Sequence, residues 1–166
     1  MEKIVIKQLD MRNLSVLEDI IELQKKSYRI EADFIGFDNI PPLHDTVDTL
    51  SESEETFCGI YIDGNLIGIV SYIVENGVFD IYRMAVHPNF FRRGIGDKLL
   101  SYILKIGADE FVDKFVVSTG MKNEPAKKLY LKHGFKFIGD KEVTGGLKIS
   151  TFEKKVGNIE GGVYNG

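Results

Sequence analysis

Cysteines and long hydrophobic runs are scarce in this sequence, and each scarcity excludes a class of protein. The 166 residues include one cysteine, Cys58, so no disulfide can form within the chain, and we expect a reducing compartment. The longest apolar-rich run, residues 66–74, is too short to span a bilayer. Residues 1–10 contain neither a long apolar stretch nor a signal-peptide cleavage pattern. We therefore expect a cytoplasmic protein with no membrane partner.

Excess positive charge is also absent. The formal net charge is -4, which argues against nucleic acid as the main partner. The charges are unevenly distributed, because residues 31–55 include eight acidic side chains and no Lys or Arg, whereas residues 122–136 include five lysines and one acid. The first region would favour cations and the second anions, although each cluster alone is also compatible with a solvated surface.

The hydrophobic pattern predicts about seven strands and about four helices. Strands are predicted at residues 3–9, 56–62, 65–74, 78–86, 114–119, 135–140 and 147–155. Helices are predicted at residues 14–30, 44–55, 97–111 and 123–134. The Pro-Pro pair makes residues 36–43 irregular. The sequence therefore predicts one domain of α/β class, of the mixed α+β type, over residues 1–156, followed by a glycine-rich tail at 157–166.

Two arginines and two glycines lie where the strand at 78–86 passes into the next helix: Arg92, Arg93, Gly94 and Gly96. Cations are unfavourable at a helix N-terminus unless an anion offsets its partial positive charge. The first turn of a helix has unsatisfied amides, and glycine lets a bulky group approach them closely. The stretch could therefore form a socket for a phosphate or pyrophosphate. A simple turn with both arginines in water remains the alternative.

Neighbouring residues argue against two other glycine motifs. Gly96 is followed by Asp97 and Lys98, whereas a Walker phosphate loop requires Lys and then Ser or Thr. A dinucleotide fingerprint would need a glycine where Leu99 stands. It would also open the first strand–helix unit of a parallel sheet, whereas three hairpin-type strands are predicted before this joint.

Two stretches together resemble the diagnostic motifs of the GNAT superfamily of N-acetyltransferases: "MAVHPNFFRRGIGDKLL" at residues 84–100 and "NEPAKKLYLKHGFKFIG" at residues 123–139. The predicted order of elements is similar to that family as far as about Lys155. The resemblance implies a central, mostly antiparallel mixed sheet flanked by helices. It also implies acetyl-CoA as the acetyl donor, and no metal.

The resemblance further implies roles for individual residues. The glycine turn would wrap the pyrophosphate of CoA with backbone amides, and the preceding strand would pair with the pantetheine arm like an added strand. The sequence departs from the family at Phe91, where Gln or Arg is common, and at Arg92, where many members have Gly. The implied cofactor-binding residues are Met84, Ala85, Val86, Arg92, Arg93, Gly94, Ile95, Gly96, Asp97 and Asn123.

Acetyl transfer to an amine requires a neutral amine and an acid that protonates the departing thiolate. Tyr130 shares a helix face with Ala126, Leu129 and His133. Spacing alone fits a core tyrosine, but family members often have a tyrosine acid at this position. For the acceptor side and the base the candidates are Asp80 and Tyr82, which lie two apart on one strand, and Glu31. We expect structural roles for His87 and His133, and a core position for Cys58.

The acidic region at residues 31–55 would border the acceptor side if the family layout holds. We therefore expect a cationic acceptor such as a polyamine, an amino sugar or a peptide amine. The main prediction is an N-acetyltransferase that moves the acetyl group of acetyl-CoA directly to a primary amine of a small molecule or peptide. The alternative is a catalytically inactive acyl-CoA-binding module of the same fold. Exposed sheet edges and aromatic residues such as Phe135 and Phe137 also permit a homodimer, although such residues more often simply pack within the fold.

Overall fold

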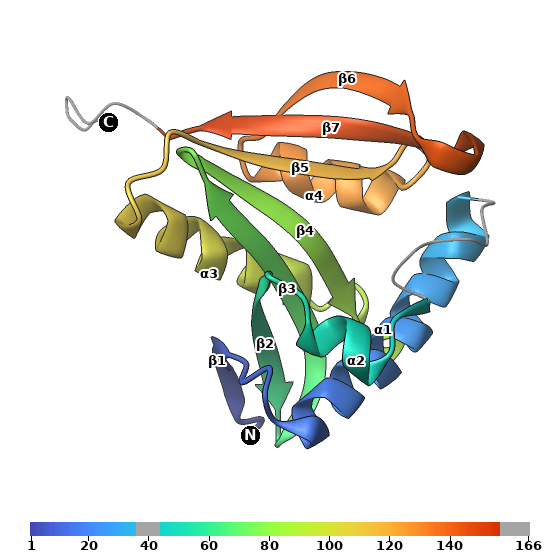
Figure 1. Ribbon diagram of the computed structural model, residues 1–166, viewed down its shortest axis with the longest axis vertical. Coiled ribbons are helices and arrows are strands. Elements are labelled where there is room, and N and C mark those ends of the chain that lie inside the picture. The colour runs from blue at the N-terminus through green and yellow to red at the C-terminus, as the bar shows by residue number, and fades with distance from the viewer. Residues whose placement is uncertain (36–43, 157–166) are drawn as a thin grey trace.

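The structure, a computed structural model, describes residues 1–35 and 44–156, which fold around one seven-stranded sheet (Figure 1). The predicted irregular segment at 36–43 and the predicted tail at 157–166 lie outside the described residues. In chain order the main elements are β1 (Ile4–Gln8), α1 (Leu14–Ile35), α2 (Val47–Ser51), β2 (Thr56–Ile62), β3 (Asn65–Glu75), β4 (Val78–Val86), the 3₁₀ turn η2 (Pro88–Phe90), α3 (Ile95–Asp109), β5 (Lys114–Gly120), α4 (Glu124–Lys132), β6 (Lys136–Glu142), the 3₁₀ turn η3 (Thr144–Gly146) and β7 (Lys148–Lys155).

The strands are arranged in the order β1-β2-β3-β4-β5-β7-β6. All neighbouring pairs are antiparallel except β4 and β5, which are parallel. The prediction of a mostly antiparallel mixed sheet with about seven strands and about four helices is therefore confirmed for the described residues. The boundaries differ slightly, since α2 is shorter than predicted and α3 begins at Ile95 instead of Asp97.

The ends of the elements follow from local sequence. Asp63–Gly64 and Asn76–Gly77 adopt positive φ (51° and 84°, 53° and 78°), which fits the two-residue turns that join strands with the native twist. The Asn123 side chain accepts a hydrogen bond from the Ala126 amide and so caps α4. Gly134, at φ 89°, follows the C-terminal end of α4. Asn123 and Gly134 thus bound α4 at its two ends.

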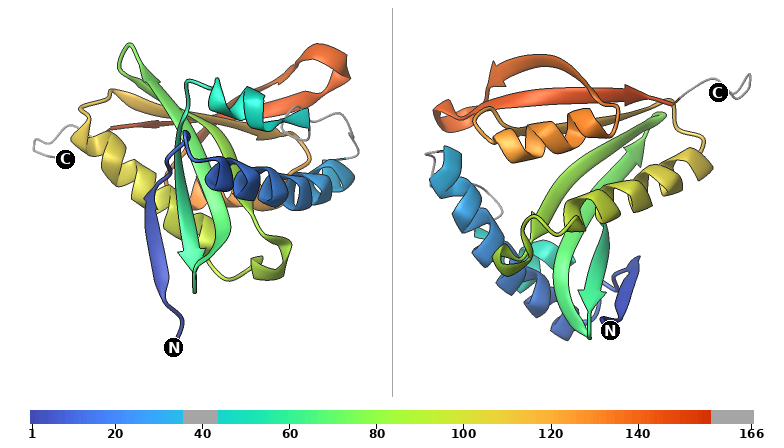
Figure 2. Two further views of the ribbon diagram at one scale, coloured as in Figure 1. Left: turned by 60° about the horizontal axis from the view of Figure 1, so that its bottom comes forward. Right: turned by 180° about the vertical axis from the view of Figure 1, so that it is seen from behind.

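Helices cover both faces of the sheet, and each face has its own hydrophobic core. Seen from behind, α3 and α4 lie in front of the strands, while α1 and α2 lie on the other side (Figure 2). Residues of α3 such as Leu99 and Ile103 pack with Phe79 in the first core. Residues of α1 such as Ile20 pack with Phe57 in the second core.

The middle of the sheet opens between β4 and β5. Their parallel pairing extends from Val78–Lys114 only as far as Ile81–Val117, and beyond that point the two strands diverge (Figure 1). The register between β3 and β4 also shifts just here, which leaves Tyr82 as an extra residue on β4. Such a bulge bends and re-aims a strand. The opening between the carboxyl ends of β4 and β5 therefore exposes backbone that a continuous sheet would pair.

The bulge also shifts the alternation of side chains along β4. Phe79 and Ile81 belong to the core under α3, and after the bulge Met84 and Val86 pack against that core. Ala85 instead belongs to the core under α1. A single extra residue thus sets which β4 side chains point toward the opening.

Candidate functional site

The entrance to α3 has a backbone that few residues adopt. Arg92 has φ 65° and Gly94 has φ 75°, both in the left-handed region. Gly94 is the N-cap of α3 and makes no side-chain capping bond, so the first amides of the helix are not satisfied by a cap. A Cβ at Gly96 would lie 3.1 Å from the Cδ2 atom of Leu129 on α4. These features leave the helix N-terminus accessible to an anion.

A cavity of about 450 Å³ adjoins this entrance. It lies between α1, the end of β4, the start of α3 and the first turns of α4. Its lining residues are Ser27, Ile30, Met84, Val86, Phe90, Phe91, Arg92, Gly94, Ile95, Gly96, Asp97, Asn123, Pro125, Ala126 and Leu129. Eight of the ten residues predicted for cofactor binding thus surround one cavity; Ala85 and Arg93 are not among its lining residues.

The two residues that do not line the cavity have clear positions. Ala85 is 2% exposed and packs in the core under α1, and its backbone lies opposite Ile69 of β3, so neither its side chain nor its polar backbone atoms face the cavity. Arg93 forms hydrogen bonds of 2.8 and 2.9 Å with the Glu2 carboxylate. Its guanidinium also lies over the Phe90 ring, 4.9 Å from the centroid. The neighbouring arginines therefore differ, because Arg92 lines the cavity and the Arg93 charge is directed toward the N-terminal residues.

The backbone of β4 presents hydrogen-bonding groups toward this cavity. The His87 amide donates to the Ile67 carbonyl oxygen at 2.7 Å, on the side of β3. The Val86 amide donates instead to the Ser27 hydroxyl oxygen at 3.2 Å, on the side of α1. Since backbone groups two residues apart face the same way along a strand, the Met84 backbone shares the orientation of Val86. This edge of β4 can accept an extended chain as an added strand.

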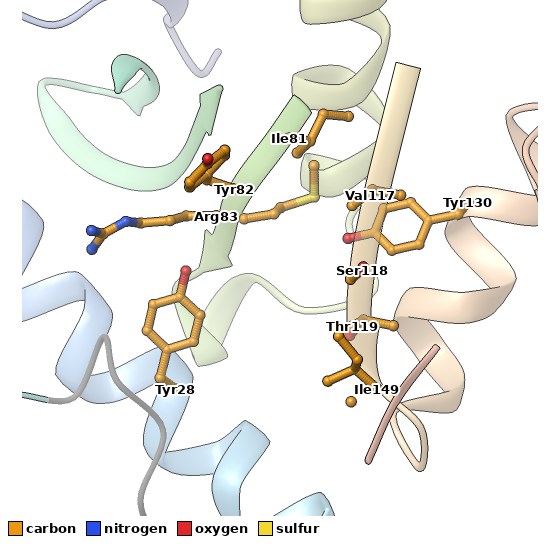
Figure 3. A pocket seen from close by; sticks show the side chains of 11 residues that line it. Tyr28, Ile81, Tyr82, Arg83, Val117, Ser118, Thr119, Tyr130 and Ile149 are labelled. Carbon is orange, nitrogen blue, oxygen red and sulfur yellow. The ribbon is translucent and has the colours of Figure 1, made fainter. Parts of the chain in front are cut away.

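A smaller cavity of about 180 Å³ continues from the first, and Met84 lines both. Tyr28 from α1 and Tyr130 from α4 extend into it from opposite sides, and Arg83 from β4 lies beyond Tyr28 (Figure 3). The end of β5, including Ser118, forms another wall of this cavity. The two cavities meet where β4 and β5 diverge, so a long molecule in the larger cavity could place one end among these tyrosines.

Tyr130 lies on the inner face of α4, as the spacing predicted. Its side chain is 5% exposed, and its ring packs at 5.9 Å from the ring of Phe135 and 5.8 Å from that of Phe152. These aromatic contacts hold the ring, while the hydroxyl is directed toward the cavity beside Val117 (Figure 3). A held hydroxyl at this position can donate a proton to a group bound in the cavity.

Arg83 joins several elements through buried polar contacts. Its guanidinium donates to Glu55 at 2.9 and 3.0 Å, to Gln24 at 3.0 Å and to Asp45. Burial lowers the Arg83 pKa, but its hydrogen bonds to Glu55 and Asp45 raise it overall. Sequence reasoning missed this network, although the arginine in the mostly apolar strand β4 was a signal. Two acids of the region at 31–55 are consequently directed inward to a cation of β4.

The predicted acceptor-side residues occupy different surroundings. Asp80 is half-buried on β4, and burial raises the pKa of its carboxyl group. Tyr82 is 53% exposed, and its pKa is raised by partial desolvation and by the negative charges of Asp80 and Glu55. The bulge lies at Tyr82, so strict alternation no longer relates the two residues. Glu31 lies on α1, but its side chain is outside the described residues.

The remaining ionisable candidates have structural contacts. His133, at the C-terminal end of α4, lies 2.8 Å from Asp97 in the first turn of α3, and Lys132 lies 3.0 Å from the same carboxylate. The hydrogen bonds from His133 and Lys132 lower the pKa of Asp97. Cys58 is 1% exposed, and burial raises its pKa to about 11, which favours the unreactive thiol. His87 accepts a hydrogen bond from the Asn89 amide.

Two absences concern metals and membranes. Within residues 1–35 and 44–156, no group of three or more His, Cys, Asp or Glu side chains is placed to hold a metal ion. In the same part of the chain, no helix combines the length and apolar character needed to cross a membrane.

A family model and two curated sequences match this chain. The model described as "Acetyltransferase (GNAT) family" matches residues 17–135. The "UPF0157 protein YqkA" of Bacillus subtilis (strain 168) is 35% identical over 148 residues, which is 89% of this chain and 43% of that protein. The "Uncharacterized N-acetyltransferase YedL" of Escherichia coli (strain K12) is 28% identical over 92 residues, which is 54% of this chain and 58% of that protein. The chain thus spans about half the length of these relatives.

Solved structures share the fold. The PaiA N-acetyltransferase of Thermoplasma acidophilum, solved in complex with coenzyme A, superposes with a TM-score of 0.73 over 93% of this chain and 99% of that chain, at 21% sequence identity. At this identity the likeness establishes the arrangement of helices and strands.

Proposed function

The chain belongs to the acetyltransferase (GNAT) family, whose model matches residues 17–135, and on that premise we propose that it transfers the acetyl group of acetyl-CoA directly to a primary amine. Family membership confirms the resemblance seen in the two sequence motifs. The observation that carries the proposal is the cavity at the α3 entrance, where the exposed helix N-terminus and the open edge of β4 meet.

The cofactor assignment follows from the two kinds of backbone that line this cavity. The amides from Gly94 to Asp97 suit an anion, and CoA has a pyrophosphate. The edge from Met84 to Val86 suits an extended chain with amide groups, and the pantetheine arm of CoA is such a chain. With both parts in place, the thioester would lie near Met84, where the smaller cavity begins. Arg92 and Asn123 would border the phosphates from either side.

The smaller cavity supplies groups for the chemistry. We assign Tyr130 the role of general acid, because its hydroxyl is held by aromatic packing at the point where the thioester sulfur would lie. As the amine attacks the acetyl carbonyl carbon, the carbon–sulfur bond breaks and the sulfur takes the Tyr130 proton. We assign the role of general base to Asp80, which does not line the cavity itself but precedes the lining residue Ile81 on β4, and which would accept the amine proton directly or through water. Burial raises the pKa of Asp80, so this carboxylate accepts a proton more readily than an exposed aspartate does.

Charge on the acceptor side supports a cationic acceptor. Negative charge from Asp80, Glu75 and Glu54 acts on Tyr82, the exposed aromatic residue at the bulge. Carboxylates beside an aromatic ring attract ammonium groups. We therefore favour polyamines, amino sugars, and lysine or N-terminal amines of peptides. A cytoplasmic location and a homodimer remain predictions from the sequence.

The proposal is tested by release of CoA thiol from acetyl-CoA against a broad panel of amines, with wild type, Tyr130→Phe and Tyr61→Phe. Tyr130→Phe removes the acid but keeps the packed ring, so we expect kcat to fall by roughly 10²-fold or more while CoA binds as before. Tyr61, on β2 beneath Lys7, is the matched control, and its substitution should leave kcat unchanged.

The outcomes also separate the alternative of an inactive acyl-CoA-binding module. Binding of CoA without thiol release for any amine would favour that module. Equal rates for wild type and Tyr130→Phe would remove Tyr130 from the mechanism. Stabilisation by NADH or ATP, with none by acetyl-CoA, would refute the cofactor assignment.

A further inference from the structure

Ser27 on α1 makes a contact that the proposed chemistry does not use. Its side chain is 8% exposed, it lines the larger cavity, and its hydroxyl oxygen accepts the Val86 amide of β4 at 3.2 Å. The two residues are 59 positions apart in the sequence. The hydroxyl is thus the hydrogen-bond partner of one backbone donor on a strand edge that otherwise faces the cavity.

The geometry of β4 shows why the donor that Ser27 engages is the one that an added chain would need. The His87 amide is directed to β3, where it bonds the Ile67 carbonyl, so the Val86 amide is directed away from β3. Within residues 1–35 and 44–156 no strand lies on that side, because pairing with β5 ends at Ile81–Val117. A chain that adds to β4 from the cavity therefore needs the Val86 amide, and Ser27 already occupies it.

We infer that the Ser27 hydroxyl is a placeholder for an amide carbonyl of the cofactor's pantetheine arm, an inference that rests on the proposed function. In the free protein the placeholder satisfies a part-buried donor, which is costly to leave unpaired. When the arm pairs with β4, its carbonyl oxygen accepts the hydrogen bond of the Val86 amide, and the Ser27 hydroxyl turns aside. Binding of the acyl donor thus replaces the hydrogen bond between the Val86 amide and Ser27 with one between the Val86 amide and the pantetheine carbonyl.

Removing the hydroxyl should move stability and affinity in opposite directions. In Ser27→Ala the free protein has an unpaired Val86 amide and is less stable. The arm then no longer competes with the hydroxyl, so it binds more tightly. Since one hydrogen bond contributes on the order of a fivefold change in an equilibrium constant, we expect the Kd for CoA to fall by about threefold to fivefold.

The experiment compares wild type with Ser27→Ala and Ser27→Cys, whose thiol is a weaker acceptor of similar size. Kd is measured by calorimetry for CoA and for pantetheine, which lacks the nucleotide. Melting temperature and hydrogen exchange of the Val86 amide are measured with and without CoA. Ser101→Ala, on the exposed face of α3, is the control. Both Ser27 variants should bind CoA and pantetheine more tightly, melt lower when free, and exchange the Val86 amide faster until CoA is added.

The contrary results are distinct. Weaker CoA binding in both Ser27 variants would make Ser27 a direct cofactor contact, and unchanged Kd values would make it a structural residue, so either result overturns the placeholder role. A Val86 amide that stays unprotected with CoA bound would overturn it as well. If the wild type binds no CoA, the proposed function itself fails and this inference fails with it.

Discussion

Arg92 combines backbone strain with an exposed charge at the cavity, and substitution by glycine should separate the two. The residue has φ 65°, and a side chain in the left-handed region costs about 1–2 kcal/mol. Glycine removes that strain but loses about 0.5–1 kcal/mol through the greater freedom of the unfolded chain. We therefore expect Arg92→Gly to stabilise the free protein by about 0.5–1 kcal/mol, which raises the melting temperature by about 1–4 °C for a chain of this size.

The same substitution should weaken cofactor binding. Arg92 lines the cavity, and no hydrogen bond or ion pair engages its side chain within the described part of the chain. A cation near a phosphate at a solvated surface contributes about 1 kcal/mol, so the Kd for CoA should rise by about fivefold. The difference between variant and wild type should shrink as salt is added. Calorimetry with CoA, and with dephospho-CoA to identify the phosphate concerned, measures the effect.

Two further variants make this reasoning refutable. Arg92→Ala keeps the strain and removes the charge, so it should lose the same affinity and gain no stability. Arg93→Ala breaks the exposed pair with Glu2, which contributes about 0–1 kcal/mol, and should leave CoA affinity unchanged. A destabilised Arg92→Gly protein, or equal CoA affinity in Arg92→Gly and wild type, would contradict the account.

Two other substitutions test the base and the buried network. The Asp80 carboxylate must be unprotonated to accept the amine proton, and its pKa is raised. As the pH is lowered, kcat/KM should therefore begin to fall at a pH above the ordinary pKa of an aspartate. In Asp80→Asn this acid limb should vanish and kcat/KM should drop by roughly 10²-fold or more, whereas an unchanged pH profile would exclude Asp80 as the base. Arg83→Met leaves Asp45 and Glu55 buried without their cation, so urea unfolding should show that the free energy of unfolding falls by about 3–5 kcal/mol. The control Arg12→Met removes an exposed ion pair and should change the free energy of unfolding by at most about 1 kcal/mol. Equal losses in the two variants would refute the importance of the Arg83 network.

Much of the fold could be read from the sequence because its signals are local. Asp63–Gly64 and Asn76–Gly77 define two hairpins, and Asn123 and Gly134 bound α4, all through chemistry within a few residues. The glycine entrance to α3 was likewise visible in Gly94. These features depend on backbone preferences that a short stretch of sequence expresses by itself.

The parts of the site that could not be predicted depend on contacts between distant segments. Ser27 meets Val86 across 59 positions, and nothing near either residue indicates the other. Arg83 finds Asp45 and Glu55 only because the residues just before α2 and just before β2 converge on β4. The different directions of Arg92 and Arg93 follow from the position of Glu2, which periodicity does not report.

Acetyl transfer to an amine is tested most directly with acetyl-CoA that carries an isotopic label in the acetyl group. The labelled donor is incubated with wild type or Tyr130→Phe and an amine that supports thiol release, and the products are separated and examined by mass spectrometry. We predict that the label appears in an amide of the acceptor, in an amount equal to the CoA released, and that Tyr130→Phe forms it at least 10²-fold more slowly. Label recovered only as free acetate, or no difference between the two proteins, would contradict the account.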